Sequence, residues 1–96
     1  MKTLSQFKKD IQIGDTIECV YFNWTGTTNT EVPEKMKGIR TVERKNTVGF
    51  VLNGSHCEWP KASELEYEGN TFTISPKDKD GKVFQVRKYI IISNIH

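Results

Sequence analysis

Apolar and capping residues near the start of the chain have the spacing of a helix. Leu4 and Phe7 lie three positions apart, which places them on one helical face. Thr3 followed by Gln6 forms a capping box, in which the two side chains satisfy backbone groups at the first turn. These signals predict a short amphipathic helix over about residues 3–10.

Strand-like segments follow a break at Gly14-Asp15. Residues 16–24 are dense in β-branched and aromatic side chains, which favour a pleated, half-buried surface. Residues 39–43 have a similar character and turn at about residue 45 into a further strand over 47–52. Residues 83–92, after Asp80-Gly81, form the last predicted strand.

The pair Asn53-Gly54 between two strand-like runs is a strong signal for a two-residue hairpin turn. The turn fixes the register, because side chains alternate between the two faces of a strand. On the predicted core face, Leu52 lies opposite Ser55, Phe50 opposite Cys57, and Val48 opposite Trp59. His56 and Glu58 then point to the other face.

A second turn, Gly69-Asn70, predicts another hairpin by the same rule. It pairs Tyr67 with Phe72 and Leu65 with Ile74 on the core face. The residues left on the outside are Glu66, Glu68, Thr71 and Thr73.

Five to seven short antiparallel strands and one N-terminal helix indicate a mainly β protein. Strands this short and numerous usually curl, because closure removes exposed sheet edges. We therefore expect a single domain over residues 1–96, built as a small antiparallel barrel or roll of SH3-like or OB-like type. The turn Ile13–Ile17 resembles the entry turns of SH3-like barrels.

Residues 25–38 have the composition of a loop. They contain two glycines, a proline and very few apolar side chains, at a length that is unusual inside a compact domain. We expect this segment to be mobile, since it offers little to pack against a core.

The composition and net charge of the chain agree with a small mainly β domain and indicate no particular partner. Of 96 residues, 14 are Lys or Arg and 12 are Asp or Glu, a net charge of +2, which is far from the strongly basic balance of a dedicated nucleic-acid binder. The start lacks the apolar run of a secretory signal, and the longest apolar stretch, Tyr89–Ile92, is too short to span a membrane. We therefore expect a cytoplasmic location, no membrane partner, and free thiols at Cys19 and Cys57.

Chemical motifs point away from catalysis. His56 and Cys57 are neighbours on a strand, so they project to opposite faces and cannot share a proton. The two cysteines have no spacing typical of a zinc site, Asp78–Val83 does not follow a calcium loop, and the glycines form no phosphate-binding loop. We predict no enzyme activity, no cofactor and no metal.

One region could bind nucleic acid. Five bases follow the long loop and Trp24 stands at its entrance, so that phosphates could be held while a base stacks. The candidate residues are Trp24, Lys35, Lys37, Arg40, Arg44 and Lys45. The alternative is that these charges only solvate a loop and protect an edge strand. Negative charge over residues 58–68 would instead suit a protein partner.

Several segments resemble a succession found in small proteins encoded by phages and mobile elements of Gram-positive bacteria. These segments are Lys37–Val42, Asn46–Gly49, Trp59–Ser63 and Tyr67–Phe72, and the likeness covers about residues 4–75. The resemblance implies a bacterial or phage origin and transfers no functional residue.

Taken with the residues, the resemblance predicts a non-catalytic binding module, an accessory protein of a mobile element. Its partner is either nucleic acid, bound weakly, or a host or phage protein that it inhibits or modulates. A small enzyme ranks below both.

Overall fold

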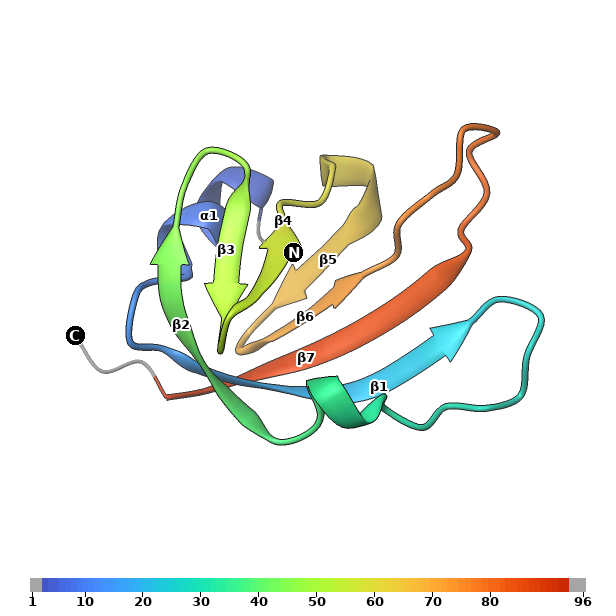
Figure 1. Ribbon diagram of the computed structural model, residues 1–96. Helices are drawn as coiled ribbons and strands as arrows, with labels where there is room; N and C mark the ends of the chain where they lie inside the picture. The colour runs from blue at the N-terminus through green and yellow to red at the C-terminus, as the bar shows by residue number, and fades with distance from the viewer. Residues whose placement is uncertain (1–2, 94–96) are drawn as a thin grey trace.

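The computed structural model describes residues 3–93, with one α-helix and seven strands in one antiparallel sheet (Figure 1). The elements in chain order are α1 (Leu4–Asp10), β1 (Thr16–Trp24), the 3₁₀ turn η1 (Glu34–Met36), β2 (Ile39–Lys45), β3 (Gly49–Leu52), β4 (Ser55–Glu58), the 3₁₀ turn η2 (Ala62–Glu64), β5 (Leu65–Glu68), β6 (Thr71–Ile74) and β7 (Gln85–Ser93). The strand order is β4-β3-β2-β1-β7-β6-β5. The mainly β prediction with one short helix is confirmed.

The helix begins as its capping signal predicts. The hydroxyl oxygen of Thr3 accepts a hydrogen bond from the backbone N–H of Gln6 at 3.1 Å. The Nζ of Lys45 donates to the carbonyl oxygens of Lys8 and Ile11, each at 2.7 Å. Lys45 therefore satisfies carbonyls at the end of α1, which the helix itself leaves without partners.

The core is shared by α1 and all seven strands. Phe7 of α1 is fully buried, and its ring contacts aromatic rings from both sides of the curled sheet. Its ring centroid lies 6.5 Å from that of Phe50 in β3, 5.3 Å from that of Tyr67 in β5 and 4.7 Å from that of Phe72 in β6. Phe7 therefore joins the two ends of the sheet through one apolar cluster.

The sheet is curled but does not close into a barrel. In the strand order, β4 and β5 are the two ends and do not pair with each other. Figure 1 shows the β3–β4 hairpin beside the β5–β6 hairpin, with β7 and β1, which connect them in the strand order, running below both. Phe7 and Trp59, whose ring centroids lie 5.9 Å apart, pack in the core near this opening. Side-chain packing thus takes the place of strand pairing, and the closed-barrel form of the prediction is not observed.

Strand β1 has the predicted bounds and connects the two halves of the sheet. It pairs with β7 along its length and with β2 over Thr16–Glu18. Its register with β7 shifts between Cys19 and Tyr21. This bulge inserts one residue, so that Cys19 and Phe22 are both buried although they lie three positions apart.

Both predicted hairpins have the expected pairing. Phe50 lies opposite Cys57, and Tyr67 lies opposite Phe72. Asn53 and Gly54 both have positive φ, at 47° and 85°, as a type I′ turn requires. Local turn chemistry therefore sets the register here.

The prediction that Val48 faces the core is wrong. Its side chain is 57% exposed. The side-chain oxygen of Asn46 accepts hydrogen bonds from the backbone N–H groups of Val48 and Gly49, at 2.8 and 3.0 Å. Val48 therefore belongs to a turn, β3 begins only at Gly49, and the alternation of the strand does not reach Val48.

The segment 25–38 contains no strand, but it does contact the core. Val32 and Met36 are half-buried and pack against the core cluster, although the segment was expected to offer little to a core. The side-chain nitrogen of Asn23 donates to the carbonyl oxygens of Thr27 and Asn29, at 3.2 and 3.0 Å. The mobility of this segment stays a prediction.

Candidate functional site

The inner face of the curled sheet carries two arginines on the strands that flank β1. Arg40 of β2 lies opposite Ile17, and Arg87 of β7 lies opposite Phe22. Ile17 and Phe22 are both buried, and residues directly opposite each other on paired strands share a face. Both arginines therefore project toward the interior of the fold from opposite sides of β1.

A cavity of about 180 Å³, called here the inner pocket, opens beside these arginines. It is lined by Lys35, Met36, Arg40, Leu52, Ser55, His56, Cys57, Arg87 and Tyr89. Strands β2, β3, β4 and β7 and the turn η1 all contribute to its wall. None of these lining residues is an aspartate or a glutamate, so the wall supplies positive charge without a carboxylate.

Neither guanidinium group forms an ion pair with another residue of the described chain. Arg40 is only 7% exposed, and Arg87 is half-buried. The Nε atoms of both are buried without a hydrogen-bond partner. Over residues 3–93, both ion pairs that form belong to Lys37. Buried polar groups in folded proteins are almost always hydrogen-bonded, so the two Nε atoms are exceptions among the described residues.

Three weakly acidic groups on which the two arginines act remain uncharged at neutral pH. Burial raises the pKa of the Cys57 thiol and of the Cys19 thiol, and it raises the pKa of the Tyr89 hydroxyl well above its usual value. Arg40 and Arg87 act in the opposite direction on all three groups, but burial is the larger cause. No thiolate or phenolate therefore neutralises the guanidinium charges at pH 7.

Tyr89 gives the inner pocket a rigid wall. Its ring stacks on Phe72, with the ring centroids 4.8 Å apart and the planes 14° from parallel. The side chain is almost fully buried. Because its hydroxyl stays protonated, it keeps a proton that a hydrogen bond can use.

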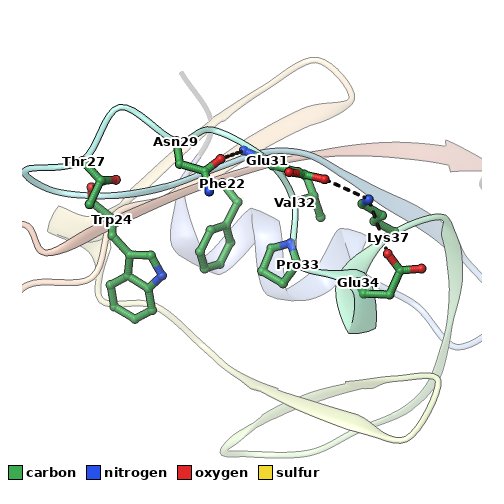
Figure 2. A pocket seen from close by; sticks show the side chains of 9 residues that line it. All are labelled: Phe22, Trp24, Thr27, Asn29, Glu31, Val32, Pro33, Glu34 and Lys37. Carbon is green, nitrogen blue, oxygen red and sulfur yellow. Dashed lines mark hydrogen bonds and ion pairs between the residues drawn. The ribbon is translucent and has the colours of Figure 1, made fainter.

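A second and larger cavity, about 400 Å³, lies beside the segment 25–38 and is called here the loop pocket (Figure 2). It is lined by Phe22, Trp24, Thr27, Asn29, Glu31, Val32, Pro33, Glu34 and Lys37. Trp24 is 51% exposed and stacks on Phe84, with ring centroids 6.3 Å apart. The loop pocket therefore has an aromatic wall that solvent can reach.

The cation of the loop pocket is paired with carboxylates. Figure 2 shows the Nζ of Lys37 between Glu31 and Glu34, at 3.3 and 3.4 Å from their carboxylate oxygens. The hydrogen bond to Glu31, followed by that to Glu34, raises the pKa of Lys37. The wall of the loop pocket therefore holds more carboxylate than amine, unlike that of the inner pocket.

The structure separates the six residues predicted to bind nucleic acid. Trp24 and Lys37 line the loop pocket, whereas Lys35 and Arg40 line the inner pocket. Lys45 is bonded to the end of α1, and Arg44 is exposed on β2 outside the walls of both pockets. The six residues do not line a single cavity, and their binding of nucleic acid stays a prediction.

Sequence reasoning missed the residues that complete the inner pocket. Arg87 lies two and four positions before Tyr89 and Ile91, which are both buried. A period of two therefore places Arg87 on the core face of the last strand. A charged residue in phase with buried ones was the signal that could have identified it.

Other searches of the structure were negative. The described residues include no group of three or more His, Cys, Asp or Glu side chains that could hold a metal ion. Within 3–93 no helix is long and apolar enough to cross a membrane. Comparison of the chain with protein-family models, with curated proteins and with solved structures gave no match.

Proposed function

We propose that this protein is a non-catalytic binding module that holds an anionic group of its partner in the inner pocket. The observation that carries the proposal is Arg40, a guanidinium that is nine-tenths buried, has an unbonded Nε and lines a cavity without a carboxylate. Leaving a buried charge unpaired costs stability. A bound anion would remove that cost.

The chemistry of the inner pocket supports binding rather than reaction. Cys57 is the thiol among the lining residues, and burial raises its pKa. A reactive cysteine needs the opposite, because the thiolate is the nucleophile. We therefore place the arginines in a binding role.

A titration with simple anions tests the proposal. Inorganic phosphate, sulfate and acetate would be added at constant ionic strength while backbone amide shifts are followed by NMR. We expect saturable shifts centred on Arg40, Arg87 and Tyr89, and their loss in Arg40→Met. The matched control is Arg44→Met, which removes the same charge from the same strand outside the pocket. Absence of saturable shifts with all three anions, or equal loss in both variants, would overturn the proposal.

A second candidate function follows from the loop pocket, namely inhibition or modulation of a host or phage protein. The exposed face of Trp24 beside Glu31 and Glu34 fits a cationic side chain of such a protein. Trp24→Ala should weaken capture of a protein partner from nuclease-treated lysate, whereas Arg40→Met should not. Capture that depends on nucleic acid would refute this candidate.

The biological setting is proposed from the resemblance alone. On that ground we propose a phage or mobile-element accessory protein that acts in the cytoplasm of Gram-positive bacteria. An SH3-like or OB-like identity of the fold is likewise a proposal, supported by the curled antiparallel sheet.

A further inference from the structure

The charge of the inner pocket narrows the kind of anion that it fits. Arg40, Arg87 and Lys35 place three positively charged side chains on the wall, two of them guanidiniums, and the wall supplies no carboxylate. A phosphate monoester carries about −1.5 to −2 at pH 7 and offers three acceptor oxygens. A carboxylate or a phosphate diester carries only a single negative charge. The monoester is therefore the common biological group that matches both guanidiniums.

Hydrogen-bond geometry points to the same group. A guanidinium presents its N–H donors as a planar fork, which matches phosphate oxygens in pairs. Arg40 and Arg87 line the same cavity from strands on opposite sides of β1, so a tetrahedral group bound there would offer different oxygens to the two forks. Ser55 and Tyr89 add hydroxyl groups to the same wall.

The size of the inner pocket restricts how the phosphate is presented. Its volume of about 180 Å³ is below the range of about 300–1,000 Å³ that is usual for sites enclosing a whole small molecule. It has room for one terminal group. A diester within a nucleic-acid backbone has a chain on both sides of the phosphate. Because strands and η1 form the wall of this small cavity, we expect it to exclude a phosphate that carries two chains.

We propose that the inner pocket binds the terminal phosphate monoester of its ligand, with Arg40 and Arg87 holding the phosphate oxygens. This inference rests on the proposed function, because it names the anion that the pocket accepts. Leu52 and Met36 supply apolar contacts for the group that carries the ester. The ester can belong to a small molecule or to the 5′ end of a nucleic-acid strand.

Calorimetric titration with three matched probes tests the anion. Methyl phosphate, dimethyl phosphate and acetate would be compared at pH 7.5 and constant ionic strength. We expect methyl phosphate to bind at least about tenfold tighter than either of the others, a difference of about 1.4 kcal/mol. Equal affinity for acetate or for dimethyl phosphate would overturn the monoester inference and leave the anion pocket standing. No binding of any probe would overturn both.

Two variants assign the binding to the pocket. Arg40→Met and Arg87→Met should each weaken methyl phosphate binding by at least about tenfold, whereas Arg44→Met should leave it unchanged. Circular dichroism and thermal unfolding would establish that each variant is folded before titration. Unchanged affinity in both folded pocket variants would contradict the assignment.

An oligonucleotide pair distinguishes the two sources of the ester. The same short single strand would be titrated with a 5′-phosphate and with a 5′-hydroxyl. If the 5′-phosphorylated strand binds more tightly than methyl phosphate, the source of the ester is the end of a strand. If the phosphorylated strand and methyl phosphate bind with equal affinity, the source is a small phosphate ester. Equal binding of the phosphorylated and unphosphorylated strands would show backbone recognition and would overturn the inference.

Discussion

Replacing Arg40 with methionine should stabilise the folded protein while it removes anion binding. The side chain is 7% exposed and its Nε has no partner. A buried polar group without a partner costs about 1–3 kcal/mol. Methionine has a similar length, adapts to irregular gaps and carries no polar group that needs a partner. Its neighbour Val42 on the same strand face is fully buried, so apolar surroundings are available.

The expected gain is about 1–2 kcal/mol in the free energy of unfolding, below the full cost because the exposed part of the guanidinium is partly solvated. For a domain of this size, each kcal/mol raises the melting temperature by about 4–8 °C. Urea and thermal unfolding of the wild type and of Arg40→Met would measure the change. Arg44→Met, on the exposed part of β2, should stay within about 0.5 kcal/mol of the wild type.

Ligand reverses this order of stabilities. Methyl phosphate at about one hundred times its dissociation constant should raise the free energy of unfolding of the wild type by about 2.7 kcal/mol. The same addition should leave Arg40→Met unchanged. A free energy of unfolding more than about 1 kcal/mol below that of the wild type in ligand-free Arg40→Met would refute the reasoning. It would show that the guanidinium stabilises the fold even when no anion is bound.

Three further predictions concern the core and the loop. Phe7→Ala should lower the free energy of unfolding by about 3–5 kcal/mol, since its ring joins the two ends of the sheet; a loss under about 1 kcal/mol in urea unfolding would contradict this. Cys57→Ser should cost about 1–3 kcal/mol and His56→Ala almost nothing, and the reverse order would mean that the hairpin faces are swapped. Residues 25–38 should be the first site of limited proteolysis, and uniformly high NMR order parameters there would contradict their expected mobility.

Features governed by local chemistry could be predicted from the sequence. The cap at Thr3, the bounds of β1 and the pairing of Phe50 with Cys57 all follow from signals within a few residues of one another. Val48 escaped prediction because the side chain of Asn46 forms a turn that competes with the strand. The turn formed by Asn46 therefore replaces the alternation of buried and exposed side chains at Val48.

The inner pocket could be predicted only in part, because it depends on strand order. Lys35 and Arg40 were among the candidates, since they follow the long loop in the sequence. Arg87 is distant in sequence and reaches the same cavity because β2 and β7 both pair with β1. The alternation of the last strand could have placed Arg87 on the core face, but pairing between distant segments carries no turn signal, so the sequence could not predict that Arg87 and Arg40 line one cavity.

The most direct test of the central claim is to locate a bound anion. Crystals of the protein would be soaked in tungstate, a tetrahedral dianion, and the tungsten would be located by its anomalous scattering. The account predicts a tungsten site in the inner pocket, with oxygens at hydrogen-bond distance from the guanidinium groups of both Arg40 and Arg87. Tungsten found only on surface lysines, with the inner pocket filled by water or by protein side chains, would contradict it.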